Sequence, residues 1–179
     1  MPIPDQSKPS PAPHAVWLCG QHGDDPDAVR VAMCAHALDR YTAPGARVLL
    51  TPADPLLSRV VTADARVLAA PRRGEATART GAALALHLPN RRRDLPAFRR
   101  TAHRALSSLA PGGVFLGSAP AATDRGLGEA VRAVEDTGLL YLQHVVAVRA
   151  AVTDGTLSPS RGRREHVDLL VFRRPEVTP

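Results

Sequence analysis

Short apolar runs without polar alternation recur along the chain, and helical stretches separate most of them. A strand buried on both faces is apolar throughout, whereas a half-exposed strand alternates between apolar and polar residues. Fully buried strands that are joined by helices form a mostly parallel sheet covered on both sides. The expected strands cover residues 15–19, 47–51, 66–70, 82–88, 114–118, 139–152 and 167–173.

Capping residues mark the helices between these runs. Asp25-Pro26 and Asp54-Pro55 each place an acidic cap before a proline, which suits the first helical turn. We expect helices over residues 26–40, 55–61, 95–109 and 124–137. The apolar face expected of the first helix consists of Ala28, Val31, Ala32, Ala35 and Leu38.

The last two strands have no helix between them, so they should form an antiparallel hairpin with a polar loop over residues 153–164. The predicted fold is therefore α/β and doubly wound, Rossmann-like, with a mostly parallel sheet and a C-terminal antiparallel hairpin.

The composition fits one domain with short tails. Hydrophobic residues make up 44% of the 179 residues, which is enough for a packed core. Residues 1–14 are rich in proline and read as a disordered tail, the domain covers 15–175, and 176–179 form a second tail. No apolar run approaches the ~20 residues that span a bilayer, and the start has no apolar signal region. We expect a cytoplasmic protein without membrane contact.

Residues 41–49, 109–115 and 166–174 read YTAPGARVL, LAPGGVF and HVDLLVFRR. In this order they resemble the lead-in to the cofactor-binding strand, the turn before the fifth strand and the closing strand of the class I S-adenosylmethionine-dependent methyltransferases. The likeness is to the DNA and RNA methyltransferases that modify amino groups in particular. The resemblance implies a methyltransferase sheet over roughly residues 15–175. Only about thirty residues separate the runs at 47–51 and 82–88, where this family fits two more strand–helix units. The expected domain is shortened in the middle.

The segment that matches the family's cofactor loop departs from the family pattern. That pattern is acidic-Pro-x-x-Gly-x-Gly-Thr, and its glycines let the backbone approach the ligand beside free helix N–H groups. Here Thr51 stands in the acidic place, and Pro55 and Leu57 stand in the glycine places. The resemblance implies cofactor contacts for Thr51, Asp54 and Ser58. S-adenosylmethionine is thus the candidate cofactor, but the substitutions favour its loss.

A second segment has two readings. Residues 59–65 resemble the family's strand followed by an acid that contacts the cofactor adenine, which would assign that role to Asp64. In the alternative register, residues 66–70 form a shortened second strand, and Asp64 precedes it.

His87-Leu88-Pro89-Asn90 takes the place of the family's substrate loop, which reads acidic, Asn or Ser, then Pro-Pro-aromatic. In the family the polar residue holds the target amine and the aromatic ring stacks on a flipped base. The candidate catalytic residues are His87, as a general base, and Asn90, as a contact to a base edge. The alternative is a histidine that is hydrogen-bonded for structural reasons.

Two arginine groups give the chain, whose net charge is +6, a way to bind phosphates. Arg91, Arg92 and Arg93 flank the substrate loop, while Arg161, Arg163 and Arg164 lie in the terminal hairpin loop. Nucleic acid is the expected partner of these groups; the alternative is a solvated surface, and the 3% of aromatic residues limits base stacking. The histidines and cysteines show no metal-ligand spacing, so no metal is expected.

Three functional hypotheses follow from the resemblance. The first is a degenerate, non-catalytic methyltransferase-like binding or regulatory module, a pseudoenzyme. The second is an active, divergent methyltransferase that acts on nucleic acid or a small molecule and uses Asp64, His87 and Asn90. The third is a scaffold subunit that binds a protein partner in a hetero-oligomer. The sequence does not determine the substrate or the oligomeric state.

Overall fold

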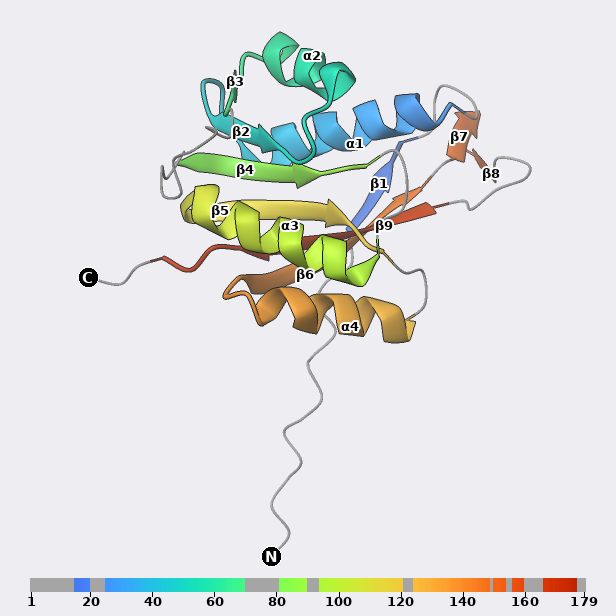
Figure 1. The fold of residues 1–179 in the computed structure, drawn as a ribbon. Coiled ribbons are helices and arrows are strands. Elements are labelled where there is room, and N and C mark those ends of the chain that lie inside the picture. The colour runs from blue at the N-terminus through green and yellow to red at the C-terminus, as the bar shows by residue number, and fades with distance from the viewer. Residues whose placement is uncertain are drawn as a thin grey trace, which may run out of the picture.

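The computed structural model describes residues 15–19, 25–69, 81–89, 94–120, 124–148, 150–153, 156–159 and 166–176, and every structural statement below concerns these residues. A seven-stranded sheet lies between helices on its two faces (Figure 1). In chain order, the elements are β1 (Ala15–Leu18), α1 (Pro26–Tyr41), β2 (Arg47–Leu50), α2 (Pro55–Ala63), β3 (Val67–Leu68), β4 (Ala82–His87), α3 (Leu95–Ser108), β5 (Leu109–Ser118), α4 (Asp124–Glu135), β6 (Leu140–Val148), β7 (Ala150–Thr153), β8 (Thr156–Pro159) and β9 (His166–Arg173).

The strand order of the large sheet is β1-β6-β9-β5-β4-β2-β3. All neighbouring pairs are parallel except those of β9, which runs antiparallel to both β5 and β6. The predicted doubly wound α/β fold with an antiparallel closing strand is therefore confirmed. Between β2 and β4 the described chain contains one strand, the two-residue β3 at the sheet edge, so the domain is shortened in the middle as predicted.

Each face of the sheet carries its own apolar core, because successive strand residues point to opposite faces. Val48 and Leu84 pack with α1 and α2 on one face. Leu49, Ala85 and Phe115 pack with α3 and α4 on the other. The strands that point side chains into both cores have the continuous apolar sequences from which they were predicted.

The predicted caps at Asp25 and Asp54 form as expected, and Asp94 caps α3 in the same way. The carboxylates of Asp25, Asp54 and Asp94 each accept a hydrogen bond from a backbone N–H in the first turn, and a proline stands at the start of each of these helices. The helices α1 and α2 extend slightly beyond the expected ends, to Tyr41 and Ala63.

The buried face of α1 differs from the prediction. Its buried residues are Val29, Arg30, Met33, Cys34, Ala37 and Leu38. Of the predicted face, Leu38 is buried and Ala32 is partly buried against the core. The helix is rotated relative to the expected face because Ala and Val occur on all its sides, and packing against α2 and β4 selects the face that carries the larger side chains.

Two further boundaries are corrected. Residues 59–63 are helical and Asp64 is the C-cap of α2, so the strand-then-acid register is wrong and the alternative register, with β3 after Asp64, is confirmed. Leu57 and Val61, one helical turn apart, are the buried residues that make this segment a helix. β5 begins at Leu109 instead of residue 114, and its register against β4 shifts between Ala82 and Leu84, which accommodates the Pro-Gly-Gly segment as a bulge.

The terminal hairpin is also more elaborate than predicted. β6 ends at Val148, and β7 and β8 form a separate two-stranded antiparallel sheet within the region expected to be a strand end and a loop. The predicted tails, residues 1–14 and 177–179, lie outside the described residues, whereas Glu176 is described. In the described part of the chain, no helix is both long and apolar enough to cross a membrane.

Candidate functional site

The candidate site lies at the carboxyl ends of β2 and β4, and we call it the β2–β4 crevice. From β2 the chain continues to β3 on one side and then returns to β4 on the other, so the strand order reverses here. In open α/β sheets, ligands bind beyond the carboxyl ends of the strands at such a reversal. Thr51, Asp54 and Ser58 on the β2 side and His87 on the β4 side all lie near this point.

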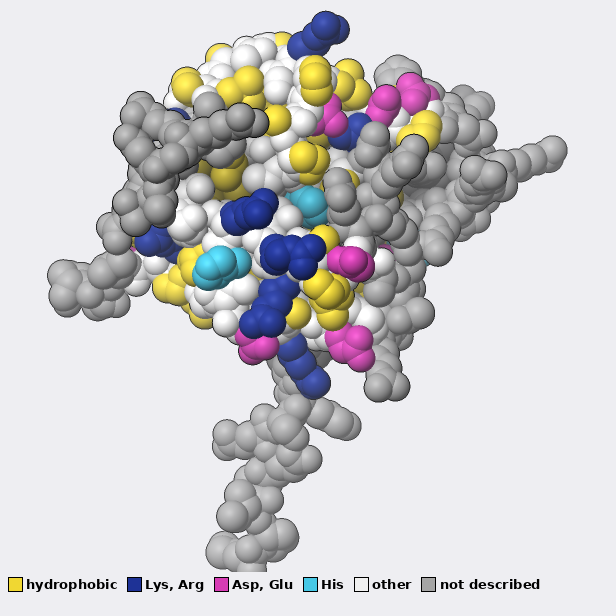
Figure 2. Space-filling model, viewed as in Figure 1, with side chains coloured by type: hydrophobic (Ala, Val, Ile, Leu, Met, Phe, Trp, Pro, Cys, Tyr) yellow, Lys and Arg dark blue, Asp and Glu magenta, His cyan; other side chains and the backbone are white. Residues whose placement is uncertain are grey.

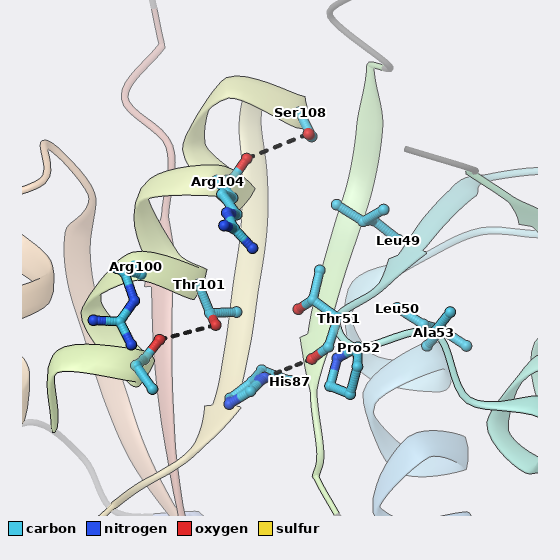
Figure 3. A pocket seen from close by; sticks show the side chains of 11 residues that line it. Leu49, Leu50, Thr51, Pro52, Ala53, His87, Arg100, Thr101, Arg104 and Ser108 are labelled. Atoms are coloured by element: carbon cyan, nitrogen blue, oxygen red, sulfur yellow. Dashed lines mark hydrogen bonds between the residues drawn. The ribbon is translucent and has the colours of Figure 1, made fainter. Parts of the chain in front are cut away.

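His87 and Thr51 join the two strand ends directly. The Nδ1 atom of His87 lies within hydrogen-bond distance of the carbonyl oxygen of Thr51, and because a carbonyl only accepts, Nδ1 carries the proton (Figure 3). The Thr51 hydroxyl donates to the carbonyl of Leu86 at 3.2 Å. His87 is 3% exposed, and its ring packs on Phe98 with centroids 5.9 Å apart. These contacts match the alternative in which His87 is hydrogen-bonded for structural reasons.

Arg30 spans the same crevice from α1. Its guanidinium donates from Nε to the carbonyl of Leu88 at 3.0 Å, from Nη1 to Asp27 at 2.8 Å, and from Nη2 to Asp54. Leu88 follows β4 and Asp54 follows β2, so one buried side chain ties the loops after both strands together. Each donor has an acidic or carbonyl acceptor, as a buried charge requires.

Asp54 serves both as the partner of Arg30 and as the N-cap of α2. Its Oδ1 accepts from the backbone N–H groups of Leu56 at 2.9 Å and Leu57 at 3.2 Å. Burial raises the pKa of Asp54, but the hydrogen bonds from Arg30 and from these two N–H groups outweigh burial and hold the pKa below its ordinary value. Ser58 donates its hydroxyl hydrogen to the Asp54 carbonyl at 2.7 Å and belongs to the same local structure.

The remaining predicted site residues lie elsewhere. Asp64 caps the far end of α2, beside the turn before β2, where the Ala65 carbonyl accepts from the Gly45 N–H at 2.8 Å. It is therefore at the amino ends of the parallel strands, and the fold does not bring it to the crevice. Asn90 and both arginine groups lie outside the described residues, and so their predicted roles stay predictions. The residues in these two groups are Arg91, Arg92, Arg93, Arg161, Arg163 and Arg164.

A cavity of about 410 Å³ opens beside the crevice on the α3 face of the sheet (Figure 3). We call it the α3 cavity. Its described lining consists of Leu49, Leu50, Thr51, Pro52, Ala53, His87, Ala97, Arg100, Thr101, Arg104 and Ser108. On the other side of α3, a groove of about 680 Å³, the α3–α4 groove, is lined by Leu95, Pro96, Arg99, Arg100, His103, Arg104, Ala133, Asp136 and Thr137.

Sequence reasoning missed the role of Arg30, although a signal was present. An arginine between Val29 and Met33, with Asp27 three residues earlier, is a charged residue inside the face that proves to be buried. A buried arginine needs acidic and carbonyl partners, and Asp54 was already the expected cap of the next helix. Only the wrong face assigned to α1 concealed this pairing.

No protein-family model and no curated protein sequence matches this chain. Solved structures match its fold. A SAM-dependent O-methyltransferase from Thermotoga maritima is similar with a TM-score of 0.51 at 12% identity, over 83% of this chain and 66% of that chain. The 1,6-didemethyltoxoflavin-N1-methyltransferase of Burkholderia thailandensis, solved with S-adenosylhomocysteine, is similar with a TM-score of 0.50 at 12% identity, over 86% of this chain and 80% of that chain.

The chain has the class I methyltransferase fold. At 12% identity the likeness shows the fold alone, and function depends on the site. Among the described residues of the crevice, the groups that the family pattern would offer to S-adenosylmethionine are replaced or already bonded. The first free N–H groups of α2 bond to Asp54, Pro55 has no N–H, and Arg30 spans the space between the two loops.

Proposed function

We propose that this chain is a non-catalytic methyltransferase-fold module, related to the amino-methylating DNA and RNA methyltransferases, that acts by binding and not by methyl transfer. The observation that carries the proposal is the position of Arg30, whose guanidinium bonds to Asp54 and to the Leu88 carbonyl across the β2–β4 crevice. A ligand there would have to displace a buried charge from its partners, which is costly unless the ligand replaces every contact.

The pairing of Arg30 adds to this argument. Its guanidinium donates to the carboxylates of both Asp27 and Asp54. A ligand that entered the crevice would have to compete with these two carboxylates and the Leu88 carbonyl for the same donors.

An anionic partner fits the outer surface of the proposed module. Helix α3 carries Arg99, Arg100 and Arg104 and has no Asp or Glu within its bounds. Figure 2 shows arginine side chains gathered over α3 and α4 on one face of the molecule. We propose that the α3–α4 groove contacts the phosphate backbone of a nucleic acid, in which case the logarithm of the association constant falls linearly with the logarithm of salt concentration.

The first test is calorimetric titration of the full chain with S-adenosylmethionine and S-adenosylhomocysteine. We expect no binding heat from a protein whose cooperative thermal melt shows that it is folded. A dissociation constant in the micromolar range, about −8 kcal/mol, would contradict the proposal and favour an active, divergent methyltransferase.

The second test is a salt series with a duplex and a single-stranded oligonucleotide. Because Arg99 lines the α3–α4 groove, Arg99→Ala should lower the duplex salt slope by about 1. Arg59→Ala, an exposed arginine on α2, is the matched control and should leave the slope unchanged. Binding that does not depend on salt would overturn the nucleic-acid part of the proposal and leave a protein partner as the alternative.

A further inference from the structure

The α3 cavity shares Thr51 and His87 with the β2–β4 crevice but opens on the α3 face of the sheet. Helix α3 packs on β4 and β5 and α4 packs on β6, whereas β2 packs against α2 on the opposite face. Leu49 is on β2, and Thr51 is in the loop directly after it. Both side chains point toward the α3 face of the sheet. Among the described residues, no helix packs on β2 from this face, and the cavity lies there beside α3.

The cavity is positively charged. Arg100 and Arg104 are one helical turn apart on α3 and both line it, and its described lining contains no carboxylate. Among the described residues, neither arginine forms a salt bridge, and the bounds of α3 include no acid. Figure 3 shows Arg104 on the side of α3 nearer to Thr51 and Arg100 on the side farther from it. Both arginines line the cavity, and Arg104 lies nearer to Thr51 than Arg100 does.

The hydroxyl oxygens of two threonines in the lining can accept hydrogen bonds from a ligand. Thr101 donates its hydroxyl hydrogen to the Ala97 carbonyl at 3.0 Å, and Thr51 donates its own to the Leu86 carbonyl at 3.2 Å. Since each hydroxyl has one hydrogen, both oxygens present lone pairs to a ligand donor. His87 and Ser108 also line the cavity, and the apolar part of its wall includes Leu49 and Pro52. The lining therefore combines cations, acceptors and an apolar surface.

We infer that the α3 cavity binds a phosphate monoester that carries a hydroxylated sugar and a planar ring, of nucleoside-monophosphate size. The guanidinium of Arg104 would hold the phosphate in a two-bond fork, the threonine oxygens would accept from sugar hydroxyls or a ring N–H, and the apolar wall would contact the ring. A volume of about 410 Å³ lies in the range of small-molecule sites, ~300–1,000 Å³. This inference goes beyond the proposed function, because it assigns a small-molecule ligand to the cavity, whose arginines come from α3 and not from α1.

The test is calorimetric titration of the full chain with AMP and UMP, with adenosine, inorganic phosphate and S-adenosylhomocysteine as comparison ligands. We expect both nucleotides to bind at least about tenfold more tightly than adenosine or S-adenosylhomocysteine, which lack the phosphate. Binding of S-adenosylhomocysteine as tight as that of AMP would overturn the inference. The titration with S-adenosylhomocysteine also tests the proposed function separately. Only the proposed function requires that S-adenosylhomocysteine does not bind at the crevice.

Variants locate the site. Arg104→Ala should weaken AMP binding by about ten- to a hundredfold, the usual range for loss of a charged hydrogen bond. Arg104→Lys, which keeps the charge and loses the fork, should fall in between. Ala97→Phe should block the cavity without changing its charge, whereas Arg59→Ala on α2 should leave AMP binding unchanged.

The inference fails if AMP gives no heat at millimolar concentration, or if Arg104→Ala and Ala97→Phe both bind AMP like the original chain. Arg99→Ala separates the cavity from the nucleic-acid surface, since Arg99 lines the α3–α4 groove but not the cavity. An AMP affinity that falls with Arg99→Ala as far as with Arg104→Ala would place the nucleotide in the groove and overturn the assignment.

Discussion

Replacing Arg30 by methionine tests whether its contacts stabilise the β2–β4 crevice. Methionine keeps the long apolar stem and a high helix propensity, so the change removes chiefly the guanidinium. It leaves the Leu88 carbonyl and the Asp54 carboxylate without their charged donor. Removing one partner of a buried ion pair costs about 3–5 kcal/mol. The Asp54 side chain is 20% exposed and keeps some hydration, so we expect about 3 kcal/mol.

The assay is urea unfolding followed by circular dichroism, together with a thermal melt. A loss of ~3 kcal/mol should lower the melting temperature by about 6–12 °C in a domain of this size. Arg59→Met makes the same chemical change at an exposed position of α2 and should stay within about 0.5 kcal/mol of the original chain.

A double-mutant cycle with Asp54→Asn isolates the pair. Asparagine caps a helix as well as aspartate does, so this change removes the charge and keeps the cap of α2. We expect a coupling energy of about 1–3 kcal/mol between Arg30 and Asp54. A cost below ~1 kcal/mol for Arg30→Met, or a coupling within ~0.5 kcal/mol of zero, would refute the reasoning that Arg30 bridges the crevice.

The pH dependence has a definite sign. Because the folded pKa of Asp54 lies below its ordinary value of 3.8, its ionised form stabilises the fold above that value. The stabilisation is lost as pH falls below 3.8 through the lower folded pKa. Arg30→Met removes the strongest hydrogen bond that lowers this pKa, so the acid-induced loss of stability should be smaller in that variant than in the original chain.

Other predictions test the core and the cysteines. Gly117→Ala should lower the free energy of unfolding, measured in urea, by about 1–3 kcal/mol. The added Cβ would lie 2.6 Å from Phe98 Cε2 in the buried core. Gly128→Ala on α4, which has open space around it, should not destabilise the fold. Burial raises the pKa of Cys19 to about 11 and that of Cys34 to about 12. Both native thiols should therefore react with a disulfide reagent at pH 8 only as fast as the protein opens, and rapid labelling of folded protein would contradict this. Since unfolded thiols ionise near 9.0, stability should fall as pH rises from about 9 toward 11 or 12.

Much of the fold could be predicted because its signals are local. Asp25, Asp54 and Asp94 cap their helices through side-chain bonds to N–H groups two or three residues away. The apolar runs of β4 and β5 follow from burial on both faces of the sheet. The pattern of neighbouring residues did not reveal three features, because they depend on contacts between separate segments. These are the placement of β1 beside β6, the small β7–β8 sheet and the rotation of α1.

The sequence by itself determined the α/β class, the antiparallel closing strand and the shortened middle, since strand periodicity, caps and segment lengths are written along the chain. It also placed Thr51, Asp54, Ser58 and His87 at strand or helix ends, where they meet in space. Only the tertiary structure decided that Asp64 lies at the opposite end of the sheet, that Arg30 bridges Asp54 and Leu88, and that a cavity lies beside Arg104. These features arise where elements from separate parts of the chain pack together, and packing of the whole sheet sets the relative positions of these elements.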